Sequence, residues 1–79
     1  MPAQVTVRYW AGARRAAGRD SEELLARDIA DLREQLAQRP ELASVIAASS
    51  VLVDSAQTED DHPLQAGAVV DVLPPFAGG

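Results

Sequence analysis

The two most β-branched segments of this 79-residue chain lie near its opposite ends, and this placement limits the folds it can adopt. Gln4 to Trp10 alternates apolar and polar side chains with the period of two that is typical of a half-buried strand. Ala68 to Leu73 is an almost continuous apolar run, which is typical of a strand at the centre of a sheet. We therefore expect the first and last strands to pair in parallel in the middle of one sheet.

The length predicts one small domain. A chain of this size can bury about 60% of the surface that it exposes when unfolded. Of the residues, 47% are hydrophobic, but many of these are alanine, so the larger valine, leucine and isoleucine side chains must fill the core. No linker, repeat or low-complexity stretch divides the sequence, and we expect a single domain over residues 1–79.

A helix is predicted in the middle of the chain. Asp28 is the expected N-cap residue, with Asp31 near the positive end of the helix dipole. An apolar stripe at helical spacing follows, formed by Ile29, Leu32 and Leu36. Pro40 is expected to end this helix, and Glu41 to Ala48 to form a second, shorter one.

The remaining segments complete a mixed sheet. Ser21 to Arg27 has helical propensity, but it would also suit a second strand that pairs back on the first. Val51 to Val53 is a buried type of strand, and a short edge strand is expected near Ala56-Gln57. This order of elements predicts an α+β fold of the β-grasp, ubiquitin-like class, in which a mixed sheet of four to five strands packs on one main helix.

Charge and composition exclude several classes of function. The net charge is −5, whereas binding to nucleic-acid phosphates needs a basic surface. The chain lacks cysteine, and its one histidine, His62, is expected to be a structural turn residue beside Pro63. No apolar run is long enough to span a membrane, and the first residues do not resemble a signal peptide. We expect a cytoplasmic protein that binds no metal, nucleic acid or membrane.

The last six residues, 74–79, are the most informative part of the sequence for function. Pro74-Pro75 stops the last strand, because proline cannot continue the hydrogen-bond ladder. Phe76-Ala77-Gly78-Gly79 follows, with little side-chain bulk beyond Phe76. We expect a flexible tail that can enter a narrow channel in a partner enzyme and present the α-carboxylate of Gly79. Small residues are also common at inert, disordered termini.

Three segments resemble the MoaD/ThiS family of sulfur-carrier proteins, and most closely its MoaD branch, the small subunit of molybdopterin synthase. These segments are V-T-V-R-Y-W-A-G-A-R at Val5–Arg14, D-H-P-L-x-x-G at Asp61–Gly67, and P-P-F-A-G-G at Pro74–Gly79. The terminal segment is the most specific of the three. Members of this family share the β-grasp fold, in agreement with the predicted order of elements.

The resemblance implies a mechanism in which other proteins act on the carrier. An adenylating partner enzyme of the MoeB type uses ATP to convert the terminal carboxylate into an acyl-adenylate, and a sulfur donor then converts it into a thiocarboxylate. The large catalytic subunit, of the MoaE type, uses this sulfur to build the dithiolene of molybdopterin. The carrier itself then binds no cofactor and is not an enzyme alone.

The resemblance also assigns roles to individual residues. Gly79 carries the adenylate and then the sulfur, and Gly78 is the slim neighbour that lets the tail enter its channel. The extended lead-in consists of Pro74, Pro75, Phe76 and Ala77. Leu73 and Trp10 match apolar positions that contribute to docking on partners, although both could instead pack in the core. Gln57 stands where such chains often have an apolar contact residue.

Other functions remain open from the sequence. The same terminal chemistry could serve thiamine synthesis, cysteine synthesis or tRNA thiolation. A ubiquitin-like modifier, which forms isopeptide bonds with targets, would also have a Gly-Gly end; the absence of lysine prevents only chains linked through lysines of this protein. A binding module with an inert tail is the fourth alternative.

Overall fold

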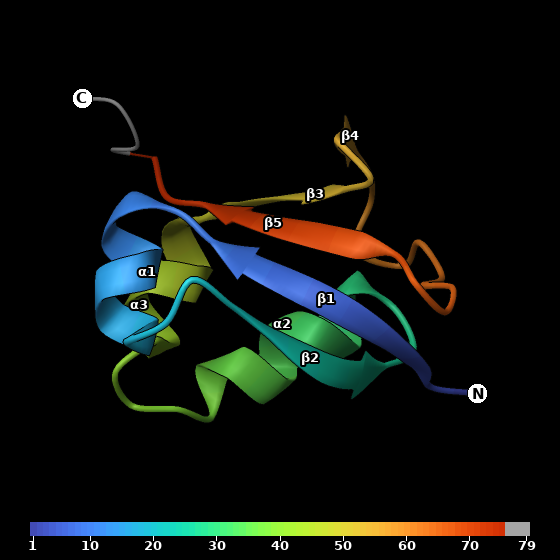
Figure 1. Ribbon diagram of the computed structural model, residues 1–79, viewed down its shortest axis with the longest axis horizontal. Coiled ribbons are helices and arrows are strands. Elements are labelled where there is room, and N and C mark those ends of the chain that lie inside the picture. The colour runs from blue at the N-terminus through green and yellow to red at the C-terminus, as the bar shows by residue number, and fades with distance from the viewer. Residues whose placement is uncertain (76–79) are drawn as a thin grey trace.

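The computed structural model describes residues 1–75 and consists of a five-stranded mixed sheet with its helices on one side (Figure 1). In chain order, the elements are β1 (Ala3–Tyr9), α1 (Ala11–Ala17), β2 (Ser21–Ala26), α2 (Ile29–Ala37), α3 (Ala43–Ala48), β3 (Ser50–Val53), β4 (Ala56–Gln57) and β5 (Val69–Leu73). The longest helix is α2. This architecture confirms the predicted α+β, β-grasp fold.

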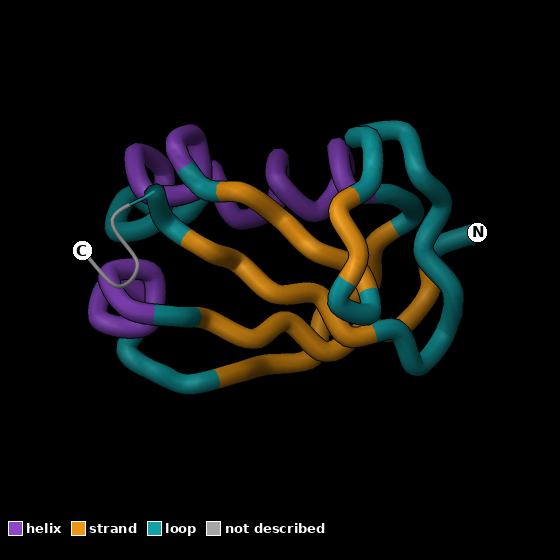
Figure 2. Tube along the Cα trace, turned by 90° about the horizontal axis from the view of Figure 1, so that it is seen from above, coloured by secondary structure: helices purple, strands orange, loops and turns teal. Residues whose placement is uncertain are grey.

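The two end strands pair as predicted. The strand order is β2-β1-β5-β3-β4, and β1 runs parallel to β5 with Thr6 opposite Val69 and Tyr9 opposite Val72. On its other side β5 pairs antiparallel with β3, which places β5 at the centre of the sheet. The short strand β4 lies at the edge, at the predicted position Ala56-Gln57. Figure 2 shows the curved sheet with α2 and α3 along one side of it.

The ambiguous segment after α1 is a strand. β2 pairs antiparallel with β1 from Ala3 opposite Ala26 to Arg8 opposite Ser21. Its exposure alternates along the chain, with Leu25 exposed and Ala26 buried. Pairing with the free edge of β1 satisfies backbone groups that a helix at this place would leave unpaired on β1, so tertiary pairing overrides the local helical propensity.

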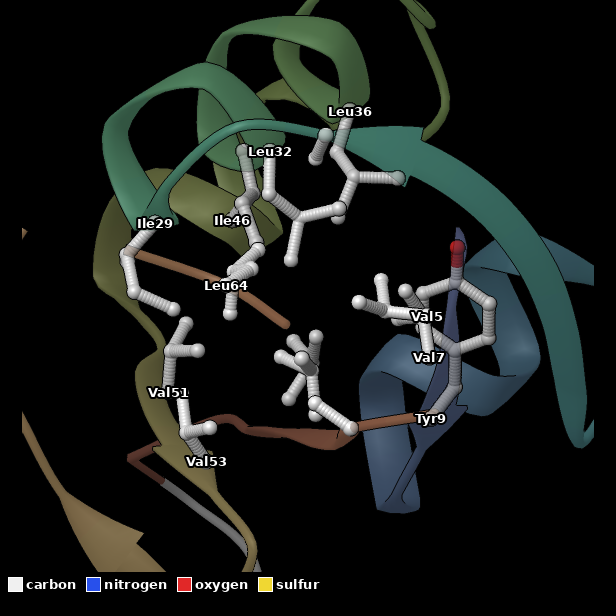
Figure 3. Close-up of a cluster of buried hydrophobic side chains, with 14 of the residues drawn as sticks. Val5, Val7, Tyr9, Ile29, Leu32, Leu36, Ile46, Val51, Val53 and Leu64 are labelled. Carbon is white, nitrogen blue, oxygen red and sulfur yellow. The ribbon is translucent and has the colours of Figure 1, made fainter. Parts of the chain in front are cut away.

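Helix α2 begins where the sequence predicts. The carboxylate of Asp28 accepts a hydrogen bond of 2.8 Å from the backbone N–H of Asp31, which satisfies one of the free donors of the first turn. The predicted stripe of Ile29, Leu32 and Leu36 is buried. In Figure 3, these side chains meet Val5, Val7 and Tyr9 from β1 and Val51 and Val53 from β3. The core therefore lies between the helices and one face of the sheet.

The alternation of the strands places a second set of side chains on the opposite face, which we call the open face. It includes Thr6 and Arg8 from β1, Leu52 from β3, and Val69, Asp71 and Leu73 from β5. Among residues 1–75, no helix covers this face (Figure 1). The chain leaves β5 at one end of the open face, and this end is where the functional residues predicted from the sequence gather.

Candidate functional site

The start of α1 and the end of β5 lie side by side. The backbone N–H of Trp10 donates a hydrogen bond of 3.3 Å to the carbonyl oxygen of Val72, which continues the parallel pairing by one step beyond β1. Trp10 and Leu73, which lie far apart in the sequence, are therefore neighbours at the point where the chain leaves the sheet.

Trp10 presents much of its side chain to solvent. It is 45% exposed, whereas the core alternative for this residue would require burial. Leu73 is half-buried on the open face. The structure thus places both of these apolar residues where a partner can reach them, and their contribution to docking stays a prediction.

The lead-in to the tail begins against the helices. Pro74 is buried, so the first residue of the expected flexible tail belongs to the packed domain, while Pro75 is exposed. The two prolines line a shallow, mostly apolar cavity of about 220 Å³ together with Gly12 from α1 and Val45 and Ala48 from α3. The remaining predicted site residues, Phe76, Ala77, Gly78 and Gly79, lie outside the described residues.

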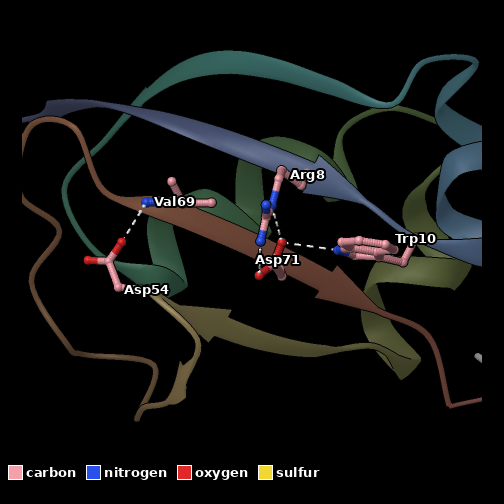
Figure 4. Close-up of polar contacts among 5 residues, drawn as sticks. All are labelled: Arg8, Trp10, Asp54, Val69 and Asp71. Atoms are coloured by element: carbon pink, nitrogen blue, oxygen red, sulfur yellow. Dashed lines mark hydrogen bonds and ion pairs between the residues drawn. The ribbon is translucent and has the colours of Figure 1, made fainter.

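A polar cluster that the sequence did not predict lies beside Trp10 on the open face. We call it the Asp71 cluster; it consists of Arg8, Trp10 and Asp71 (Figure 4). The Asp71 carboxylate accepts hydrogen bonds from Nε of Arg8 at 2.6 Å, from Nη2 of Arg8 at 2.9 Å, and from the indole Nε1 of Trp10 at 3.0 Å. The Arg8 guanidinium also lies 5.6 Å from the centre of the Trp10 ring, within the range of a cation–π contact.

The electrostatics of this cluster follow from its geometry. The hydrogen bonds from Arg8 lower the pKa of Asp71, burial opposes them, and the indole N–H adds a smaller lowering effect. Asp71 is therefore ionised at neutral pH although its side chain is only 7% exposed. The one sequence signal for it was a single acidic residue within the apolar run of the last strand.

A shallow cavity of about 280 Å³ opens next to the cluster. Its lining residues are Arg8, Tyr9, Trp10, Arg14, Asp20 and Ser21. Guanidinium groups and an indole can bind a partner's polar and aromatic groups. The described residues of this region are therefore suited to binding.

Residues elsewhere offer little further chemistry. His62 lies exposed in a turn, where its backbone N–H donates to the carbonyl of Glu59. Within residues 1–75, no three His, Cys, Asp or Glu side chains come together as metal ligands would. None of the helices in that range is both long enough and apolar enough to cross a membrane.

Comparison with known proteins defines the class. The model of the ThiS family matches residues 7–79, so the chain belongs to the ThiS family. The match includes the β-grasp domain and continues through the Gly-Gly end. The predicted resemblance to MoaD/ThiS sulfur carriers is thereby confirmed at the level of the family.

Solved structures with this fold include proteins of two kinds. A Pyrococcus furiosus protein described as a candidate subunit 1 of molybdopterin converting factor is 29% identical, with a TM-score of 0.82 over 94% of this chain and 99% of its own. A chain of the complex of subunits 1 and 2 of molybdopterin-converting factor from Helicobacter pylori is 23% identical, with a TM-score of 0.78 over 96% of this chain and 99% of its own.

The second kind is a protein modifier. Small archaeal modifier protein 1 from Methanosarcina acetivorans is 23% identical to this chain, with a TM-score of 0.83 over 100% of this chain and 99% of its own. No curated protein sequence matches significantly. The fold is thus shared by MoaD-like subunits and ubiquitin-like modifiers, and fold alone does not choose between them.

Proposed function

We propose that this protein carries sulfur as a thiocarboxylate on Gly79 and supplies it for the dithiolene of molybdopterin, as the small subunit of molybdopterin synthase. The observation that carries this proposal is the family match, which extends from the β-grasp domain through Gly78 and Gly79. The likeness to the Pyrococcus furiosus protein, at 29% identity, supports the molybdopterin branch.

The chemistry needs activation, because a carboxylate is a poor electrophile with no usable leaving group. ATP adenylates the Gly79 carboxylate on a MoeB-like partner, releasing pyrophosphate and making AMP the leaving group. A persulfide sulfur attacks the carbonyl carbon and expels AMP, and a thiol then reduces the resulting acyl disulfide to the thiocarboxylate. The sulfur is anionic and polarizable, so it is a good nucleophile at neutral pH. ATP is used by the partner and not held by the carrier.

The described part of the chain supplies the docking surface in this scheme. Trp10 and Leu73 offer apolar contact area beside the end of β5, and Pro74 and Pro75 set the direction in which the lead-in starts. The complex of subunits 1 and 2 in the Helicobacter pylori structure supports a large-subunit partner for a domain of this fold. Gly78, with no side chain, fits passage through a narrow channel.

A ubiquitin-like modifier is the second candidate function. The likeness of the fold to the Methanosarcina acetivorans modifier favours it. The first step, adenylation of the Gly79 carboxylate, is common to both functions. They diverge when sulfur or a target lysine attacks the adenylate or a derived thioester, so an experiment must identify the product.

The test is an intact-mass measurement of the carrier before and after incubation with ATP, a MoeB-like enzyme and a persulfide donor. We expect the gain of one oxygen-to-sulfur exchange, located in the peptide that ends at Gly79. Locating it matters because oxidation of Met1 or Trp10 gives a nominally equal gain. Matched controls are a chain with one residue added after Gly79, which should gain no sulfur, and His62→Ala, which should react normally.

The outcomes separate the alternatives. Release of molybdopterin after addition of the large subunit and the cyclic pterin precursor would support the proposed branch. A thiocarboxylate that this subunit does not consume would point to another sulfur pathway. Attachment of Gly79 to lysines of other proteins would support a modifier, and no change at Gly79 with an enzyme active on a control carrier would contradict the proposal.

A further inference from the structure

Asp71 is the single charged residue of the central strand β5, and its carboxylate is covered by two other side chains. Its flanking residues, Val70 and Val72, point into the core, so the alternation of the strand directs Asp71 to the open face. There Arg8 and Trp10 reduce the exposure of its side chain to 7%. A carboxylate removed from water is costly unless donors satisfy it, and these two residues supply three hydrogen bonds.

The same bonds fix the position of Trp10. Its indole is 45% exposed, and its Nε1–H donates to Asp71. The second contact to the ring is the guanidinium of Arg8, which Asp71 itself holds with a bidentate pair. Asp71 therefore orients the indole directly through one hydrogen bond and indirectly through Arg8.

The cluster is built on the most central strands of the sheet. Arg8 and Asp71 are direct partners in the parallel register of β1 and β5, so strand pairing alone brings them to the same face. Trp10 directly follows β1, and its backbone N–H donates a hydrogen bond to Val72 of β5. Groups mounted on paired strands are held more closely than groups on loops, which suits a contact that must be formed before a partner arrives.

We propose that Asp71 is a positioning residue, which holds the indole of Trp10 in a fixed orientation on the free carrier so that Trp10 is ready to dock on the partner. This inference rests on the proposed function, because it assumes that Trp10 is part of the docking surface. An exposed tryptophan that is already ordered loses less side-chain freedom on binding, and the benefit appears as tighter binding without a new contact. Because Arg8 pairs with Asp71, the neighbouring apolar side chains of Leu52 and Leu73 do not lie beside an unpaired charge.

The first arm of the test uses the free carrier. Trp10 is the sole tryptophan, so the indole N–H signal in nuclear magnetic resonance reports on this side chain alone. We expect an order parameter near the rigid value of about 0.85 in the wild type and below about 0.6 in Asp71→Val. Asp71→Asn retains one acceptor and should be intermediate. Asp54→Asn is the control, because it also removes one negative charge, beside Val69 at the start of β5. It should match the wild type (Figure 4).

The second arm measures the dissociation constant for the MoeB-like adenylating enzyme by calorimetry. We expect Asp71→Val to weaken binding roughly fivefold to tenfold through the lost ordering of the ring, with Asp54→Asn within twofold of the wild type. Trp10→Phe keeps a ring but has no N–H to donate to Asp71. In the Trp10→Phe background, Asp71→Val should therefore weaken binding by less than about twofold. A general electrostatic or folding effect of Asp71→Val would not be reduced by Trp10→Phe.

Three results would overturn the inference. In Asp71→Val, the indole of Trp10 could stay as ordered as in the wild type. The affinity of Asp71→Val for the adenylating enzyme could also match that of Asp54→Asn. The Asp71→Val effect could also be undiminished on the Trp10→Phe background. These results would leave the proposed function intact. A wild-type carrier that does not bind the enzyme at all would overturn the inference and the proposed activation of the carrier together.

Discussion

The guanidinium of Arg39 donates two hydrogen bonds, of 2.6 and 2.7 Å, to the carboxylate of Glu22. This pair joins the segment after α2 to strand β2 and closes one end of the core. The hydroxyl of Tyr9 donates a third hydrogen bond, of 2.6 Å, to the same carboxylate. The Glu22 side chain is 9% exposed, so its charge depends on these donors for solvation.

Replacement of Glu22 by Gln should lower the free energy of unfolding by about 1–3 kcal/mol, because Arg39 loses its charged partner in a partly buried place. Urea unfolding at neutral pH would measure the loss. Glu23→Gln is the matched control, since Glu23 lies exposed on the same strand and should change stability by less than about 0.5 kcal/mol. Equal stability of the two variants would show that the Arg39–Glu22 pair does not stabilise the fold.

The stability of the protein should fall in acid because the largely buried carboxylates of Glu22 and Asp71 are stabilised in their charged form. Hydrogen bonds from Arg39 lower the pKa of Glu22, and those from Arg8 lower the pKa of Asp71, with burial opposing both effects. A carboxylate whose pKa is lower in the folded state adds stability above its unfolded pKa and loses it as the pH falls through the folded pKa. The unfolded values are near 4.5 for Glu and 3.8 for Asp.

We therefore expect the free energy of unfolding to decrease as the pH falls below about 4.5. The decrease should be shallower in Glu22→Gln and in Asp71→Asn than in the wild type. Urea titrations from pH 7 to pH 2 on the three proteins would measure these slopes. If the variants followed the wild-type slope, other carboxylates would be responsible for the acid sensitivity.

Tyr9 should ionise later in the folded protein than in the unfolded chain. Burial raises its pKa above the ordinary value of 10.0, and its hydrogen bond to Glu22 raises the pKa further. A group with a raised folded pKa adds stability that is complete below the unfolded pKa and is lost as the pH rises towards the folded one. Stability should accordingly decrease above about pH 10, and Tyr9→Phe should remove this part of the decrease.

Phenolate absorbance measures this directly, because Tyr9 is the sole tyrosine of the chain. The native protein should develop the absorbance at a higher pH than the protein in urea. Coincident curves would mean that Tyr9 has no protected hydroxyl.

Replacement by alanine should change the stability in opposite directions at Gly12, inside α1, and at Gly18, which caps the end of α1. Gly18 ends the helix with a φ of 75°, a left-handed conformation that strains other residues, so Gly18→Ala should cost about 1 kcal/mol. Gly12 lies inside the helix, and an added Cβ would meet Nη2 of Arg15 at an ordinary distance of 3.7 Å. Gly12→Ala should thus stabilise the protein by about 0.5 kcal/mol. Thermal melting of both variants tests the pair, and shifts in the same direction would contradict it.

Local patterns in the sequence were sufficient for much of the fold. The alternation of Gln4 to Trp10 identified β1, and the cap at Asp28 identified the start of α2, because each of these signals is contained within a short stretch of sequence. Ser21 to Arg27 could not be assigned, because its own residues favour a helix and only the pairing of Ser21 to Ala26 with β1 makes a strand there. Such pairing is a tertiary effect that a local pattern does not contain.

The candidate site was predictable only where a motif marks it. Trp10 and Leu73 were proposed from the resemblance, and the structure places them together at the end of the sheet. The Asp71 cluster escaped prediction because Arg8 and Asp71 are 63 residues apart and meet only through the register of β1 and β5. Burial of Pro74 depends in the same way on the packing of α1 and α3, which no local signal reveals.

The parallel pairing of β1 with β5 has a consequence for folding during synthesis. Among the strands of residues 1–75, β1 comes first in the sequence, yet its partner on one side, β5, comes last. The described sheet cannot close until β5 has been made, and contacts between such distant segments form slowly. A chain cut short before Val69 would lack the central strand β5 and should be recognised as unfolded.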